Sequence, residues 1–148
     1  MQREDYLLRM IAQMARVLAR IRRKLLDEQY AEAGAELESA AQHAGIDLPF
    51  VVSLDESSLR PLLTTGGELD RPKCAFFAEL VYLEWRRQVA LGQRDRAARY
   101  AVRALQLYAF AYDGIVVDDA TRQRIAELEG DAELSALLND LEIDGPIP

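Results

Sequence analysis

Apolar residues along most of the chain recur every three or four positions, which is the spacing of one face of an α-helix. The clearest example lies near the N-terminus, where alternating steps of four and three separate Leu7, Ile11, Met14, Leu18, Ile21 and Leu25. Two apolar triplets, 50–52 and 115–117, are the only β-like stretches, and each is too short to form a sheet of its own. The pattern therefore predicts an all-α fold.

Turn and cap residues divide the chain into six or seven helices. We expect long helices over about 4–26, 30–44, 72–91 and 95–112, a short helix opening after Asp55, and two further helices over about 118–129 and 131–141. Gly45, Gly92 and Gly130 stand where helices should end. Residues 45–71 form an irregular middle with connectors at 47–49 and 64–67, and residues 144–148 form a loose tail.

Length and composition fit one soluble folded domain over residues 1–143. The chain has 148 residues, half of them apolar and 29% charged, which is typical of a globular protein and not of a disordered one. No apolar run is long enough to cross a membrane, and no apolar signal-peptide core follows the N-terminus. A single cysteine excludes an internal disulfide, so we expect a cytoplasmic protein.

Charge is distributed unevenly around the formal net value of −7. Residues 1–28 and 86–112 carry net charges of +3 and +5, whereas residues 29–85 and 113–148 carry −7 and −8. Ion pairs between neighbouring helices would account for most of this pattern, and a basic face for an acidic partner is the alternative. Nucleic acid is an unlikely partner because the whole chain is acidic, although arginine rows at 16–24 and 94–103 keep that hypothesis open.

Candidate catalytic residues are few. The only histidine, His43, lies near a predicted helix end, where an imidazole commonly caps carbonyl groups. The only cysteine, Cys74, lies in the first turn of a predicted helix, where the helix dipole would lower the pKa of a thiol. Neither has a partner motif, so we expect structural roles for both. We predict no catalytic residue, no metal site and no cofactor.

The chain contains an internal repeat with an offset of 64 residues. Aligning Arg22-Arg23 with Arg86-Arg87 also aligns four further identical pairs, namely Gln29 with Gln93, Ala33 with Ala97, Ala40 with Ala104, and Gln42 with Gln106. Both copies have the pattern of a helix, a tight turn and a second helix. The two hairpins are predicted over about 4–44 and 72–112, with small alanines on one face of each second helix.

Residues 90–107, with the sequence ALGQRDRAARYAVRALQL, resemble the second half of a tetratricopeptide repeat. The turn glycine Gly92, the alanine five residues later and the Ala-Leu pair seven beyond it match that family's pattern. Residues 26–33 are similar but carry Glu28 in place of the glycine. The resemblance implies helical hairpins whose first helices line a concave, peptide-binding face.

Carried over residue by residue, the resemblance places Glu79, Tyr82 and Arg86 on the concave face of the later copy. It places Ala15, Leu18 and Arg22 there in the earlier copy. Arg22 and Arg86 would then hold a carboxylate of an acidic peptide between them. The alternative is that both arginines pair with glutamates of adjacent helices.

The opening residues 3–11, REDYLLRMI, also resemble the start of a family of uncharacterised bacterial helical proteins. That resemblance covers the first hairpin best. It implies a bacterial cytoplasmic protein and no particular activity.

These observations favour a non-enzymatic module that binds a protein or peptide. The first alternative is a structural homodimer, or larger homo-oligomer, paired through the seam Leu7, Ile11, Met14 and Leu18. The second alternative is a small-molecule-binding domain that uses the aromatic residues of the later hairpin. Whether the acidic C-terminal segment masks a binding groove stays open.

Overall fold

The computed structural model describes the backbone of residues 2–143 and the side chains of residues 9 and 12–133. This part of the chain forms seven helices and one two-stranded hairpin. In chain order they are α1 (Gln2–Leu26), α2 (Tyr30–His43), α3 (Leu48–Ser53), α4 (Glu56–Leu62), β1 (Thr64–Thr65), β2 (Glu68–Leu69), α5 (Arg71–Ala90), α6 (Arg94–Ala111) and α7 (Asp119–Ile143). The predicted all-α class is confirmed.

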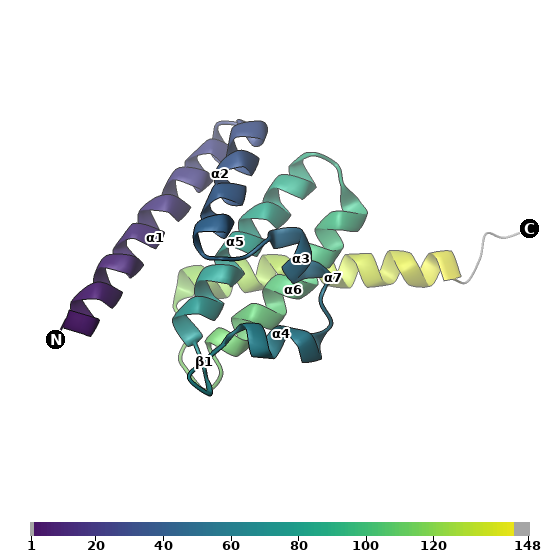
Figure 1. The fold of residues 1–148 in the computed structure, drawn as a ribbon. Coiled ribbons are helices and arrows are strands. Elements are labelled where there is room, and N and C mark those ends of the chain that lie inside the picture. The colour runs from purple at the N-terminus through teal and green to yellow at the C-terminus, as the bar shows by residue number, and fades with distance from the viewer. Residues whose placement is uncertain (1, 144–148) are drawn as a thin grey trace, which may run out of the picture.

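Two antiparallel helical hairpins, α1–α2 and α5–α6, lie side by side, and both α1 and α2 contact α5 (Figure 1). The short helices α3 and α4 link the hairpins. Helix α7 runs across α5 and α6, and its C-terminal part extends beyond them on the side away from α1 (Figure 1). None of the helices in the described part of the chain is long and apolar enough to cross a membrane.

Helix α5 forms the centre of the core. Every residue from Phe77 to Trp85 is buried, including two glutamates, because α1, α2, α6 and α7 together surround this helix. A helix that is buried on all sides needs no single apolar stripe, and α5 has none. Small residues let the neighbouring backbones approach, since the repeat alanines Ala33, Ala40, Ala97 and Ala104 are all buried.

The two hairpin turns are the same turn, as the 64-residue repeat predicts. Glu28 and Gly92 both take left-handed φ angles, 59° and 74°. In the first turn the N–H of Gln29 donates to the carbonyl of Lys24 at 2.8 Å, and in the second turn Gln93 donates to Gln88 at 2.9 Å. This pairing satisfies the last carbonyl groups of α1 and α5.

Residues 47–53 correct a sequence-based expectation. The triplet 50–52 is not β-like but lies in the helix α3, and Leu48 and Pro49 begin that helix instead of forming a connector. The Asp47 carboxylate accepts from the backbone N–H of Phe50 at 3.2 Å, and Pro49 suits the first turn of a helix. Residues 64–69, expected to include a plain loop, close as a tight antiparallel hairpin.

The C-terminal helices are a second correction. Residues 119–143 form one continuous helix, α7, where two helices separated at Gly130 were predicted. Gly130 does not adopt the left-handed conformation that ends α1 and α2. A glycine inside a helix costs only about 1 kcal/mol, which neighbouring contacts readily offset. The fully buried Leu128, two residues before Gly130, supplies such a contact.

Candidate functional site

Glu79 of α5 joins three helices through one buried carboxylate. Its Oε2 accepts from Nη2 of Arg22 in α1 at 3.3 Å, and its Oε1 lies 2.7 Å from Nη2 of Arg124 in α7. The Glu79 side chain is only 10% exposed, so both ion pairs are shielded from bulk water. Arg22 therefore adopts the second of its two predicted roles, pairing with a glutamate of an adjacent helix.

Helix α7 covers the α5 face that the repeat pattern assigns to a concave surface. The Tyr82 hydroxyl donates to Glu127 Oε2 at 2.7 Å, and Nε1 of Trp85 donates to Asp131 Oδ2 at 2.9 Å. Burial, reinforced by the bond to Glu127, raises the pKa of Tyr82 to about 12. Glu79 and Tyr82 are thus buried residues that hold α7, and neither lines an open surface.

Arg86 differs from the other three predicted binding residues. It is half-buried, and its charge acts on Tyr82 one turn earlier in α5. The described residues include no ion-pair partner for it. Because Arg22 is engaged by Glu79, the structure does not place the two arginines together as a free pair.

A second buried carboxylate, Glu84, is satisfied within its own helix. It accepts two hydrogen bonds from Arg87, at 3.0 and 2.9 Å, and one from Gln88 at 2.7 Å. The Arg87 guanidinium lies against Gly34 of α2, where an added Cβ would come within 2.9 Å of its Cζ. This arrangement connects α2 to α5, and the sequence offered no signal for it.

Arg103 belongs to the arginine row at 94–103 but lies inside the fold. It is 6% exposed, and its guanidinium donates to the backbone carbonyls of Leu54 and Val52 and to the Gln106 side chain. It thereby satisfies carbonyl groups at the end of α3. Burial lowers the pKa of Arg103 from its ordinary value. One member of the row is therefore unavailable to a nucleic acid.

The two candidate reactive side chains have different surroundings. Cys74 is fully buried, and burial raises the pKa of its thiol to about 11, which outweighs the lowering expected from the helix dipole. Nδ1 of His43 lies 2.9 Å from the Ser39 carbonyl oxygen of its own helix. In the part of the chain that the structure describes, no three His, Cys, Asp or Glu side chains gather as potential metal ligands.

A groove of about 740 Å³ lies between α1, α2 and the start of α5. Its apolar lining comes from all three helices and consists of Met14, Val17, Ala40, Ala44, Pro72, Phe76 and Phe77. Met14 is the predicted seam residue that lines this groove. Leu18 is buried in the core, and the side chains of Leu7 and Ile11 lie outside the described residues.

The charged residues of this groove are largely engaged with one another. Arg20 pairs with Glu36 at 3.1 Å, and Lys24 beside it contacts Glu32 and Glu36. The Asp70 carboxylate accepts from the backbone N–H of Lys73 at 3.1 Å and so caps α5. Among the described residues, no carboxylate pairs with the Lys73 ammonium group, which lies 5.7 Å from the ring centre of Phe77.

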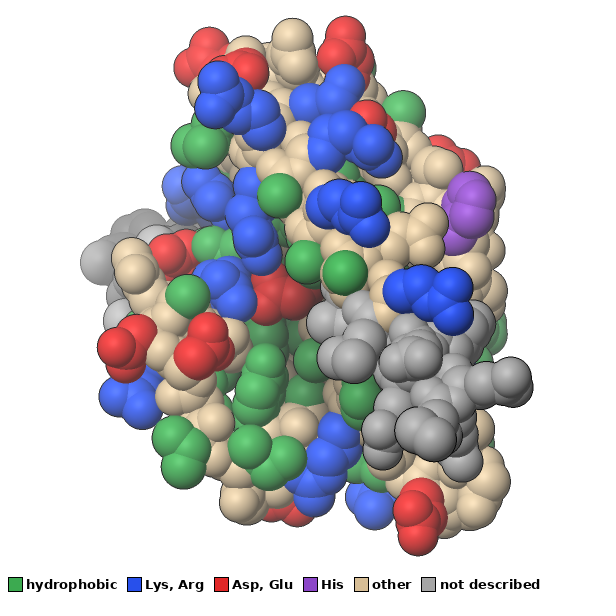
Figure 2. Space-filling model, turned by 90° about the vertical axis from the view of Figure 1, so that its left-hand side faces the viewer, with side chains coloured by type: hydrophobic (Ala, Val, Ile, Leu, Met, Phe, Trp, Pro, Cys, Tyr) green, Lys and Arg blue, Asp and Glu red, His purple; other side chains and the backbone are tan. Residues whose placement is uncertain are grey.

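Basic side chains gather on the face that carries α1, as Figure 2 shows. Arg16 and Arg20 lie one turn apart on α1 and are both exposed, and Arg20 lines the groove. Arg16 bonds only to the Ala12 carbonyl, at 3.5 Å, and no described carboxylate neutralises it. The groove therefore has an apolar floor and, beside it, two cations, Arg16 and Lys73, that have no carboxylate partner among the described residues.

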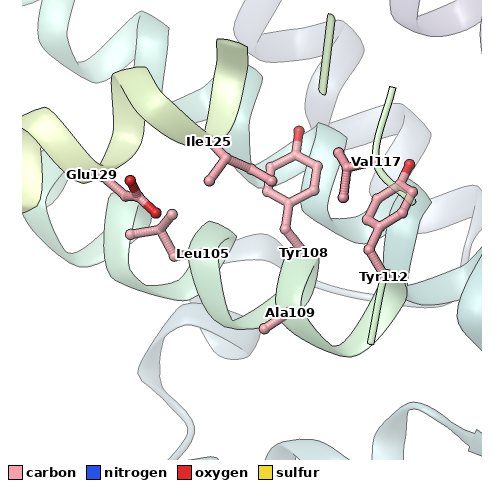
Figure 3. Close-up of a pocket in the computed structure, with 7 residues that line it drawn as sticks. All are labelled: Leu105, Tyr108, Ala109, Tyr112, Val117, Ile125 and Glu129. Carbon is pink, nitrogen blue, oxygen red and sulfur yellow. The ribbon is translucent and has the colours of Figure 1, made fainter. Parts of the chain in front are cut away.

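A smaller pocket of about 330 Å³ lies between α6 and α7 (Figure 3). Tyr108 and Tyr112 stack along it with ring centres 6.4 Å apart, and Ile125 and Glu129 enter it from α7. Tyr108 is buried, and burial strongly raises the pKa of its phenol. The pocket is mainly a gap between packed side chains and brings few polar groups together.

Comparison with known proteins gives no match: no protein-family model fits the chain, and no curated protein or solved structure is similar to it.

Proposed function

We propose that this protein is a non-enzymatic interaction module, and that the groove between α1, α2 and α5 binds a helical segment of a protein. The observation that carries this proposal is the groove itself, about 740 Å³ in volume, with an apolar floor built by three helices. An amphipathic helix that lays its apolar face into such a groove is a recurrent mode of peptide recognition. We also propose that the two hairpins are tetratricopeptide-like, and that the protein is bacterial and cytoplasmic, as the sequence suggests.

The polar groups of the groove favour a peptide over a small molecule. Small-molecule sites place several polar groups so that they converge on the ligand. Here Arg20, Glu36 and Asp70 already satisfy one another or the backbone, and Nδ1 of His43 faces a carbonyl of its own helix. A partner that contributes mainly apolar area and an acidic edge fits these groups better.

The proposal is tested by placing a photo-crosslinking residue at Ser39, which is exposed and lines the groove. The matched control places it at Glu38, which is exposed, does not line the groove and lies about 100° round α2 from Ser39. We expect specific crosslinks from position 39 only, in lysate of the source organism, and their loss when Phe76→Glu makes the floor polar. Equal crosslinking from both positions would contradict the proposal.

A further inference from the structure

The groove has an obvious candidate occupant in the C-terminal part of α7. We propose that residues 134–143 of one molecule bind in the α1–α2–α5 groove of a second copy, so that copies join head to tail. This inference rests on the proposed function and names its partner. It depends on three features: the charge and sequence of the segment, its length, and its position in the fold.

The sequence of this segment suits an apolar groove beside cations. Leu134, Leu137, Leu138 and Leu141 follow the spacing of one helical face. The segment itself has two acidic residues, Asp140 and Glu142, and no basic one. Arg16 and Lys73, which have no carboxylate partner among the described residues, would therefore meet a helix of net negative charge.

The lengths also agree. Residues 134–143 span about 14 Å of helix at about 1.5 Å per residue. The groove is lined from Gln13 to Arg20 on α1 and from Glu36 to Ala44 on α2, which corresponds to about 10–12 Å along each helix. One segment of this length fills the groove from end to end.

The position of the segment requires a second molecule. In Figure 1 the C-terminal part of α7 projects beyond the other helices, on the side opposite α1. It points away from the groove of its own chain and cannot turn back into it while α7 stays helical. A contact between two different surfaces does not close on itself in a dimer, so further copies can add in a row.

The experiment measures mass against concentration by analytical ultracentrifugation on full-length proteins. Ser39→Trp blocks the groove, and Glu38→Trp is its control at an exposed position of α2 that does not line the groove. Leu138→Glu places a charge among the leucine positions of the segment, and Ala136→Glu is its control on the opposite side of the helical spacing. Circular dichroism checks that all four variants keep the wild-type helix content.

We expect the wild type and both controls to form dimers and larger species, and each blocking variant to associate at least about tenfold more weakly. Mixing Ser39→Trp with Leu138→Glu should restore dimers and nothing larger, because one partner supplies an intact segment and the other an intact groove. An interface between identical surfaces, such as the α1 seam, would not give this rescue.

Two outcomes overturn the inference. The first is a wild type that stays monomeric at every concentration, and the second is association that the mixture of variants does not restore. Either outcome leaves the crosslinking test of the proposed function intact. If the wild type is monomeric and a different protein crosslinks at position 39, the groove is a binding site for that protein and not for a second copy of this chain.

Discussion

In the hairpin α5–α6 the first helix is enclosed by its neighbours, whereas in the hairpin α1–α2 the first helix keeps one side open. From Phe77 to Trp85 no residue of α5 is more than 8% exposed, yet Arg16 and Arg20 of α1 are exposed. The two hairpins share their turn geometry and several residues at an offset of 64. The difference shows that one local unit forms core or open surface according to what packs around it.

Charged residues follow the same division. The carboxylate of Glu79 in α5 is buried and ties α1 and α7 to the core, while Glu36 in α2 pairs with arginine and lysine side chains near the surface. A buried carboxylate that is removed leaves its partners without compensation, whereas surface pairs contribute little. Three predictions test this comparison.

The largest effect is expected at Glu79. Glu79→Ala should lower the free energy of unfolding by about 2–4 kcal/mol, because Arg22 and Arg124 lose their shared partner. Glu36→Ala, the matched control in α2, should cost less than about 1 kcal/mol. Urea denaturation followed by circular dichroism measures both. Equal losses in the two variants would mean that the Glu79 junction contributes no more than a surface pair.

A smaller effect is expected where α7 covers α5. Tyr82→Phe removes the bond to Glu127 and should cost about 1–2 kcal/mol near pH 8. The pKa of Tyr82 rises from 10.0 in the unfolded chain to about 12 in the folded protein, so the folded state holds the phenol proton more tightly. This proton stabilises the folded state fully below pH 10, and the stabilisation is lost as the pH rises toward 12. The gap between wild type and variant should therefore narrow over that range.

The control for this pH dependence is Trp85→Phe, which breaks the neighbouring bond to Asp131 without removing a group that titrates there. Its cost should stay constant between about pH 8 and 11. Urea denaturation at these pH values measures both variants. If the difference in free energy of unfolding between wild type and Tyr82→Phe also stays constant, the folded state does not raise the pKa of the Tyr82 phenol.

The smallest effect concerns the shared turn. Glu28→Gly should stabilise the protein by about 0.5–1 kcal/mol, because glycine adopts the left-handed conformation without steric cost. Gly92→Ala should destabilise the protein by about 1 kcal/mol, because alanine is strained in the left-handed conformation. A Cβ at position 92 would meet no neighbouring atom, so no steric clash adds to this cost. Thermal unfolding of both variants compares the turns directly, and changes of the same sign would show that they are not equivalent.

Helix boundaries could be read from the sequence where local chemistry decides them. The spacing of apolar residues gave α1, α2, α5 and α6 within a few residues, and the 64-residue offset correctly paired Glu28 with Gly92. Asp55 was recognised as a cap, and its carboxylate accepts from the backbone N–H of Ser58 at 3.0 Å. The break at Gly130 was wrong because a tertiary contact, the buried Leu128, outweighs the local cost of one glycine.

Fewer residues of the candidate site than of the fold could be predicted from the sequence. Arg22, Glu79 and Tyr82 were selected together, and the structure does bring Arg22 to Glu79, but as a buried junction under α7. Lys73 was not selected, and Phe76 was considered only among the aromatic residues of the later hairpin, because the groove also needs residues of α1 and α2 such as Met14 and Ala40. A groove between three helices has no signature in any one of them.

The sequence by itself determined the helical class, the two repeated hairpins, their turns and most caps, because hydrophobic spacing and capping residues act over a few neighbouring positions. Only the tertiary structure decided which helix is enclosed, which carboxylates are buried and where a groove remains open. Those properties depend on how α7 crosses α5 and how α1 lies against it, and contacts between residues about 45–57 positions apart establish that arrangement.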